Sequence, residues 1–248
     1  MSGVAEIVPA AGAGRRFGGR LAKPLVDLDG APLLVQTLRV LQRSPSIRWI
    51  IPVVGARQRV FVRRLLRWHG ITKALAPVAG GASRAESVAR GFAAMPRAAR
   101  WILIHDAARP CVSEPLIASV VRGARRWGAA ACGLPASVTV KAAEADGTVR
   151  LTLDREHLWF MQTPQAFRRE WMAQALKAVG RRNGLSEYPD DASIVEAAGF
   201  PVRIVPGDPW NLKVTTRKDL VLAETILKAR AVGSEDRRQK SEVRKGTK

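Results

Sequence analysis

Short apolar runs alternate with longer stretches of helical spacing along most of the chain. The apolar runs that predict strands are 5–10, 49–54, 74–78, 101–105, 129–134 and 202–205. The stretches that predict helices are 32–43, 57–68, 83–95, 114–127, 168–179, 191–198 and 217–229. Because strands that alternate with helices form βαβ units, the pattern predicts an α/β fold with a mainly parallel sheet.

Polar residues stand where three of these helices begin. Ser113, Asp191 and Thr216 each precede or open a helical stretch. Their side-chain oxygens can accept hydrogen bonds from the unpaired amides of a first helical turn. We therefore predict that these three residues are helix caps.

Two segments break the alternation. Residues 137–160 alternate polar and apolar positions around Ala145-Asp146-Gly147-Thr148, which predicts a protruding β-hairpin arm. The stretch 233–248 is polar and highly charged without an apolar face, which predicts disorder. The predicted organisation is one domain over 1–232, with an arm at about 137–160 and a basic tail.

Composition narrows the class of protein. A chain of 248 residues with 47% hydrophobic content can bury one good-sized core. It has no run of 18 apolar residues and no secretory pattern at its start, so we expect a cytoplasmic protein without a membrane partner. The two cysteines, Cys111 and Cys132, lack metal-ligand spacing and suit a reducing compartment.

The formal net charge of +20 raises the question of nucleic-acid binding. Eight basic residues against three acidic ones between Lys228 and Lys248 supply about +5 of that charge. The rest is scattered, as in the pairs Arg63-Arg64 and Arg125-Arg126, which is typical of solvated helix faces. Nucleic acid is therefore an unfavoured partner, whereas polyanionic small molecules are favoured ligands.

The first predicted strand runs directly into Ala10-Ala11-Gly12-Ala13-Gly14-Arg15-Arg16-Phe17-Gly18, with Lys23-Pro24 beyond. Glycines in such a loop let backbone amides turn toward phosphate oxygens, and the basic side chains add countercharge. A P-loop is excluded because Gly-Lys-Ser/Thr is absent, and the third glycine falls one place late for a dinucleotide-binding fingerprint. The alternative is a glycine-rich turn with incidental arginines.

Two further loops carry candidate chemistry. Gly80-Gly81-Ala82-Ser83-Arg84-Ala85-Glu86-Ser87 opens a predicted helix and could bind a base or a phosphate, or could be an ordinary cap. His105-Asp106-Ala107-Ala108-Arg109-Pro110 leaves the carboxyl end of a strand, where α/β sheets bind ligands. Asp106 and Arg109 could bind substrate, or could form a buried ion pair that shapes the loop. His105 is predicted to be structural.

Together with Thr139–Lys141, Thr163-Pro164-Gln165, Asp191-Ala192-Ser193 and Asn211-Leu212-Lys213-Val214-Thr215, these motifs stand in the order of a known family. From about Ala5 to Leu227 the chain resembles the 2-C-methyl-D-erythritol 4-phosphate cytidylyltransferases of the non-mevalonate isoprenoid pathway. It departs from the family pattern at Pro24, Val138 and Pro189.

The resemblance implies a Rossmann-like, doubly wound fold of the nucleotide-diphospho-sugar transferase type and a homodimer joined through the arm. It implies transfer of CMP from CTP to 2-C-methyl-D-erythritol 4-phosphate, with release of pyrophosphate and with Mg²⁺ held mainly by the CTP phosphates. The alternatives are a ribitol-5-phosphate or other alditol-phosphate cytidylyltransferase and, from another class, a basic nucleic-acid-binding α/β module.

The resemblance also implies roles for individual residues. The expected catalytic cations are Arg16, Lys23 and Lys213. The expected CTP-binding residues are Ala10, Ala11, Gly12, Gly14, Gly81, Arg84, Ser87 and Ala107. The expected acceptor-binding residues are Asp106, Arg109, Thr139, Arg155 and Thr163, of which Thr139 and Arg155 lie in the arm and are expected to reach the partner's site.

Overall fold

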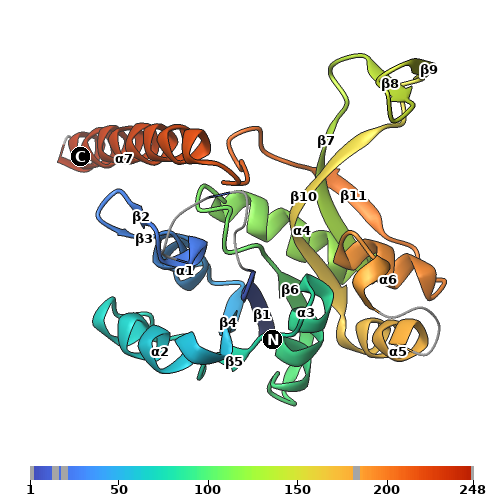
Figure 1. The fold of residues 1–248 in the computed structure, drawn as a ribbon. Helices are drawn as coiled ribbons and strands as arrows, with labels where there is room; N and C mark the ends of the chain where they lie inside the picture. The colour runs from blue at the N-terminus through green and yellow to red at the C-terminus, as the bar shows by residue number, and fades with distance from the viewer. Residues whose placement is uncertain (1–2, 13–16, 18–21, 181–184, 247–248) are drawn as a thin grey trace.

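A seven-stranded sheet forms the centre of the molecule (Figure 1). The structure is a computed structural model, which describes residues 3–12, 17, 22–180 and 185–246. Across the sheet the strand order is β11-β7-β10-β6-β1-β4-β5. The strands are β1 (Gly3–Ala10), β4 (Ile47–Val54), β5 (Val78–Ala79), β6 (Ala99–Ile104), β7 (Ala129–Pro135), β10 (Trp159–Arg168) and β11 (Arg203–Pro206).

Helices cover both faces of the sheet and form two hydrophobic layers (Figure 1). One layer joins Val4 and Val8 of β1 to α1, α2 and α4, and the other joins Ala5 and Ile7 to α3, α5 and α6. Successive strand side chains point to opposite faces, which is why alternate residues of β1 enter different layers. The helices are α1 (Leu33–Arg43), α2 (Arg59–Trp68), α3 (Arg84–Ala93), α4 (Glu114–Trp127), α5 (Arg169–Gly180), α6 (Asp191–Ala197) and α7 (Arg217–Gly246).

The predicted α/β fold with a mainly parallel sheet is confirmed. β1 pairs in parallel with β4 and β6, β4 with β5, and β7 with β11. From β1 the chain first builds outward through β4 and β5 and then returns to place β6 on the other side of β1. The order of the strands therefore reverses between the neighbouring strands β1 and β6. This position is the topological switch point, where open α/β sheets bind ligands beyond the carboxyl ends of their strands.

The sequence pattern does not predict strand β10. It assigns residues 159–160 to the end of the arm and Thr163-Pro164-Gln165 to a short motif. β10 is antiparallel to both β6 and β7 and lies between them. Its centre, Gln162-Thr163-Pro164-Gln165, is polar and contains a proline, which is unusual in an internal strand. The register with β7 shifts between Met161 and Gln165, so Pro164 needs no ladder hydrogen bond there.

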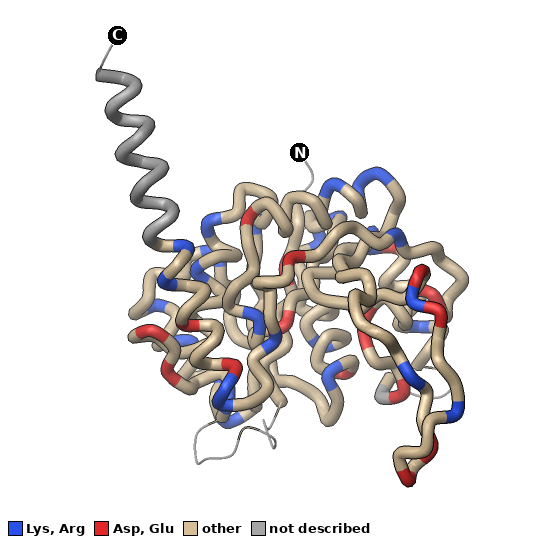
Figure 2. Tube along the Cα trace, turned by 90° about the horizontal axis from the view of Figure 1, so that it is seen from above, with Lys and Arg blue, Asp and Glu red and all other residues tan. Residues whose placement is uncertain are grey.

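The predicted arm is present as the antiparallel pair β8 (Val140–Ala143) and β9 (Val149–Leu153). It projects from the ends of β7 and β10, as Figures 1 and 2 show. Its apolar side chains are exposed, among them Val149 at 54% and Leu151 at 42%. A second small hairpin, β2 (Asp27–Leu28) and β3 (Ala31–Pro32), lies before α1.

The C-terminal segment begins as a packed helix, and the disorder expected over 233–248 stays a prediction. Helix α7 continues to Gly246 after its first turns pack Ala223, Leu220 and Leu227 against a third apolar cluster. Arginine, lysine, glutamate and glutamine dominate the extension, and all four have high helix propensity. No helix among the described residues is long and apolar enough to span a bilayer.

One acidic residue lies in the core. Glu6 is in the middle of β1, completely buried, on the face that carries Val4 and Val8. Neither of its carboxyl oxygens has a hydrogen-bond partner among the described residues. Burial disfavours the charged form and raises the pKa of Glu6 well above its usual value.

Candidate active site

A cavity of about 580 Å³ opens at the switch point, beyond the carboxyl ends of β1 and β6. A volume in this range suits a ligand of nucleotide size. Three segments that are distant in the sequence form its walls: the loop after β1, the loop between β5 and α3, and the segment that follows β6. The stretch before α7 adds Lys213 and Thr215.

Two of these walls meet at a glycine. A Cβ atom on Gly80 would lie 2.2 Å from the Cβ of Ala11 and 2.9 Å from the Ser87 Oγ, so no larger residue fits between the two loops. The Ser87 Oγ in turn accepts a hydrogen bond of 3.1 Å from the Gly81 amide and donates to the Ser83 carbonyl at 2.9 Å. Ser83 caps α3 by accepting from the Glu86 amide at 3.1 Å. These bonds fix the shape of the 80–83 loop.

Asp106 is the centre of the polar contacts in the cavity. One of its carboxylate oxygens accepts from the Arg84 Nε at 2.9 Å, and the other lies 2.7 Å from the Lys213 Nζ. Burial raises the pKa of Asp106, but the charges of Arg84 and Lys213 outweigh burial and hold that pKa below its usual range. Asp106 is therefore ionised and orients two cations that come from different segments of the chain.

Arg84 is held by a second carboxylate, Asp191, which is completely buried. The Arg84 Nη2 donates to the Asp191 Oδ2 at 2.8 Å. Burial lowers the pKa of Arg84, but Asp191 and Asp106 together raise it above its usual value. The prediction that Asp191 caps α6 is wrong, because Asp190 is the cap and accepts from the Ser193 amide at 2.9 Å. The sequence shows two adjacent aspartates and cannot tell which one turns inward.

The other two predicted caps have different outcomes. Ser113 precedes α4 but makes no side-chain capping hydrogen bond. The Thr216 Oγ1 accepts from the Asp219 amide at 3.4 Å, and the Asp219 carboxylate accepts from the Thr215 amide and hydroxyl at 2.7 Å. These bonds secure the start of α7 next to Lys213.

The loop after β6 is bonded to the segment that carries Lys213. The Val214 amide donates to the Ala108 carbonyl at 2.8 Å, and the Arg109 guanidinium donates to the Asn211 carbonyl at 2.7 Å. Asn211 is buried and donates to the Thr163 carbonyl at 2.7 Å. Arg109 is thus turned into the protein and does not line the cavity, although its side chain was expected to bind the acceptor.

Thr163 lies behind the cavity and connects it to β10. Its hydroxyl oxygen accepts from the Asp106 amide at 3.1 Å and lies 3.1 Å from the His105 Nδ1. The His105 Nε2 lies 3.0 Å from the Arg109 carbonyl, which assigns the ring proton to Nε2. Burial lowers the pKa of His105 to about 4. His105 is therefore neutral near pH 7 and braces the loop, as predicted.

The described sequence-predicted residues fall into two groups. Those that line the cavity are Ala10, Ala11, Gly12, Lys23, Gly81, Arg84, Ser87, Asp106, Ala107 and Lys213. Those that do not line it are Arg109, Thr139, Arg155 and Thr163, of which Thr139 and Arg155 belong to the arm. Gly14 and Arg16 lie outside the described residues.

The balance of charge in this cavity is positive. Lys23, Arg84 and Lys213 line it, and Asp106 is the only acidic side chain among its described lining residues. Fixed cations around a mainly apolar cavity favour a ligand that carries phosphate groups. The model of the family described as 2-C-methyl-D-erythritol 4-phosphate cytidylyltransferase matches residues 4–229. The chain belongs to this family.

Relatives and solved structures agree with this membership. A 2-C-methyl-D-erythritol 4-phosphate cytidylyltransferase of Syntrophus aciditrophicus is 42% identical over 226 residues, which cover 91% of this chain and 96% of the relative. One of Geobacter metallireducens is also 42% identical and covers 91% and 97%. The crystal structure of the Thermus thermophilus cytidylyltransferase superposes with a TM-score of 0.73 at 34% identity, covering 91% and 99%.

Proposed function

We propose that this chain transfers the cytidylyl group of CTP to 2-C-methyl-D-erythritol 4-phosphate and releases pyrophosphate, in the cytoplasm. The observation that carries the proposal is the contact of Arg84 and Lys213 with the two oxygens of Asp106 inside a nucleotide-sized cavity. The family of the chain supports the choice of both substrates.

In the proposed reaction an oxygen of the acceptor phosphate attacks the α-phosphorus of CTP. The bond from the α-phosphorus to the bridging oxygen breaks, and its electron pair leaves with pyrophosphate. Because the nucleophile is already an anion, no strong general base is needed; the protein must instead offset repulsion between anions and hold the groups in line. We assign this work to Lys23 and Lys213, with Arg16 as the third expected cation. Backbone groups of 10–12 and 80–82 would surround the nucleotide.

We assign acceptor recognition to Asp106, whose carboxylate can accept hydrogen bonds from sugar-alcohol hydroxyls. Arg109 and Thr163 would act on the acceptor through Asp106 and the loop after β6, since neither lines the cavity. Asp106 has both oxygens engaged by cations. Binding of the triphosphate would draw Lys213 partly toward phosphate and free one carboxylate oxygen for the acceptor.

The donor set of the cavity fits a magnesium ion that arrives with the nucleotide. No group of three His, Cys, Asp or Glu residues in the described part of the chain could hold a metal ion by itself. Mg²⁺ commonly binds substrate phosphates and one or two carboxylates and keeps several waters. Asp106 is the residue that could contribute such a carboxylate, and the ion would neutralise charge on the phosphates.

The test is release of pyrophosphate from CTP with Mg²⁺, using methylerythritol phosphate and ribitol phosphate as parallel acceptors and ATP, GTP and UTP as donor controls. The proposal requires release that depends on both CTP and methylerythritol phosphate. A preference for ribitol phosphate would assign the enzyme to the alditol-phosphate branch. A folded protein that releases no pyrophosphate with any pair would refute the proposal.

Replacing Asp191 with asparagine should weaken nucleotide binding more than turnover. The change keeps the shape of the side chain but removes one of the two negative charges that orient Arg84. Loss of a charge-assisted hydrogen bond of this kind costs about 1.5–3 kcal/mol, so the KM for CTP should rise about tenfold or more. Steady-state kinetics with Glu196→Gln, a more exposed change on the same helix, provide the control. An unchanged KM for CTP in Asp191→Asn would contradict this role.

We propose further that the chain forms a homodimer through its arm and that Arg155 acts at the partner's cavity. The exposed apolar residues of the arm support a partner surface, because a two-stranded hairpin is only marginally stable alone. The Arg155 Nη1 donates to the Ser137 carbonyl at 3.1 Å and is otherwise exposed.

Mixing two defective variants tests this arrangement. Arg155→Ala and Lys213→Ala should each have low activity alone. After subunit exchange, a mixed dimer would contain one cavity with both changes and one with neither, so activity should return. Arg150→Ala, on the same arm, is the control and should stay active by itself. Mixed dimers verified by native mass spectrometry that remain inactive would refute action across the dimer.

A further inference from the structure

The outer face of α2 carries large apolar side chains where a solvated helix would be polar. Val62 and Leu66 point inward and are buried in the core. On the outer side Val60 and Phe61 are each 55% exposed, and Trp68 is 86% exposed. Single exposed apolar residues are ordinary, but three on one ten-residue helix form a surface that favours a partner.

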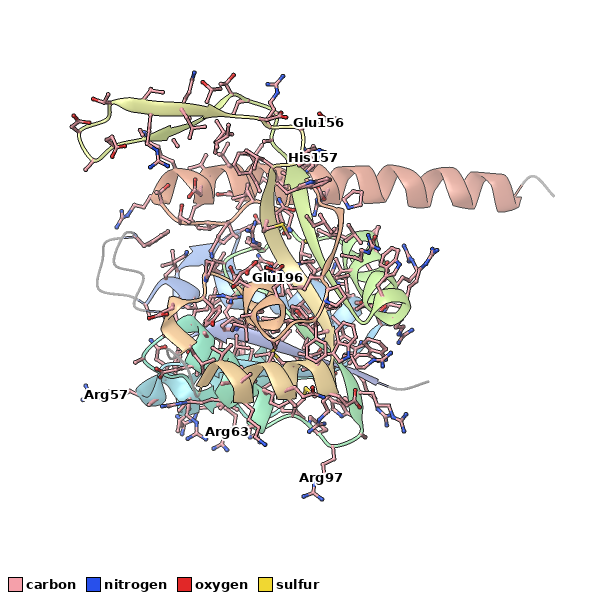
Figure 3. The ribbon with its side chains drawn as sticks, turned by 90° about the vertical axis from the view of Figure 1, so that its right-hand side faces the viewer. Arg57, Arg63, Arg97, Glu156, His157 and Glu196 are labelled. Atoms are coloured by element: carbon pink, nitrogen blue, oxygen red, sulfur yellow. The ribbon has the colours of Figure 1, made fainter. Side chains whose placement is uncertain are left out.

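This apolar surface lies among arginines without acidic neighbours in the sequence. Residues 56–68 contain five arginines, and no aspartate or glutamate occurs between Asp29 and Glu86. Arg59 donates to the Pro77 carbonyl at 2.9 Å. None of the five arginines forms an ion pair with an acidic residue in the described part of the chain. Figure 3 shows Arg57, Arg63 and Arg97 pointing away from the body on the same side of the molecule.

We propose that α2 is a docking surface for an anionic lipid bilayer. The guanidinium groups would bind lipid phosphates, for which their planar arrangement of donors is suited. Phe61 and Trp68 would enter the interfacial layer, where aromatic side chains are favoured. The sequence lacks a spanning segment and so predicts no membrane partner, but a helix that lies on the bilayer surface needs no such segment.

Charge and geometry favour lipid over the other partners. A second copy of the same face would set arginines against arginines. Nucleic acid would attract the arginines too, but Phe61 and Trp68 are seven residues apart, about 10 Å along the helix, and so cannot stack on neighbouring bases. Neither the cavity at the catalytic loops nor the one beside Trp101 is lined by an α2 residue. A flat bilayer surface can bind α2 without such a cavity.

The surface is separate from the proposed catalytic residues, so variants can test it without altering turnover. The test is sedimentation of the full chain with vesicles of phosphatidylcholine alone and of phosphatidylcholine with about one-third phosphatidylglycerol. We expect binding to the anionic vesicles only, with weakening by salt. Phe61→Ser/Trp68→Ser and Arg63→Gln/Arg64→Gln should each reduce the partition constant about tenfold or more. Pyrophosphate release should be unchanged in both.

Matched controls separate this surface from general basicity. Arg122→Gln/Arg125→Gln removes the same charge from exposed positions of α4, and Leu222→Ser removes an exposed apolar group from α7. Both should bind vesicles like the unaltered chain. The proposal is overturned if the chain ignores anionic vesicles, or if the control variants lose as much binding as the α2 variants. Binding of a single-stranded RNA through the α2 residues, without vesicle binding, would also overturn it.

Discussion

Replacing Lys213 with alanine should lower the turnover number about 100-fold or more while the protein stays folded. The Lys213 Nζ lies 2.7 Å from Asp106, and its side chain remains 41% exposed in the cavity. It can therefore reach a bound triphosphate without leaving a fully buried position. A preorganised cation stabilises charge that develops on the departing pyrophosphate, and alanine would remove it.

The measurement is the kcat for pyrophosphate release at saturating CTP, with thermal unfolding to verify the fold. Lys218→Ala is the matched control, since it removes an exposed lysine five residues away that does not line the cavity. We expect Lys218→Ala to retain nearly full activity. Lys213→Arg should retain more activity than Lys213→Ala, because it keeps the charge. Turnover equal to that of the unaltered enzyme in folded Lys213→Ala would exclude a catalytic role.

Replacing Glu6 with methionine should increase the free energy of unfolding by about 1–3 kcal/mol near pH 7. The carboxyl group is completely buried and has no described hydrogen-bond partner, whereas methionine of similar length would contact the same apolar layer. The melting temperature should therefore rise by several degrees.

The gain should also depend on pH in a defined direction. Because burial raises the pKa of Glu6 in the folded state, the folded chain binds a proton that the unfolded chain has released. Stability from this group is present below the unfolded pKa of about 4.3 and is lost above it, by up to about 1.4 kcal/mol per pH unit until the folded pKa is reached. The difference between Glu6→Met and the unaltered chain should thus be smaller at pH 4 than at pH 7.

Denaturant titrations at several pH values would measure this difference. Glu6→Gln, which keeps the shape but cannot ionise, should remove the same pH dependence with a smaller gain in stability. Glu156→Gln, at an exposed position in the arm, should leave the pH dependence of stability unchanged. A pH dependence that persists in both Glu6 variants would show that Glu6 is not its source.

The alternation of apolar runs and helical stretches was sufficient to predict the parallel part of the sheet. Each βαβ unit is a local pattern, and its strands are apolar because both faces are covered. Strand β10 could not be predicted in the same way. Thr163 in its polar centre accepts a hydrogen bond from the Asp106 amide and, through its carbonyl, one from the Asn211 side chain. Because the residues that support the cavity are polar, this strand lacks the apolar run that predicts a buried strand.

The candidate site was predictable where glycine and charge patterns are local, as at Ala10–Gly12 and Gly80–Arg84. The contacts between side chains of the site could not be predicted in this way. Arg84 meets Asp191 across 107 positions of sequence, and nothing local distinguishes Asp191 from its capping neighbour. The resemblance predicts Arg109 as an acceptor ligand, and that role stays a prediction; the sequence could not show that its guanidinium donates to the Asn211 carbonyl inside the protein.

The position of β10 also determines when the sheet can close during synthesis. β6 pairs with β1 on one edge, but its other edge waits for residues 159–168, which follow β7 and the whole arm. Until then a growing chain has an apolar edge at Ile102, Leu103 and Ile104 that could pair with another chain. A nascent chain that stalls within the arm would therefore be a substrate for chaperones, and one that has passed Arg168 can complete its sheet.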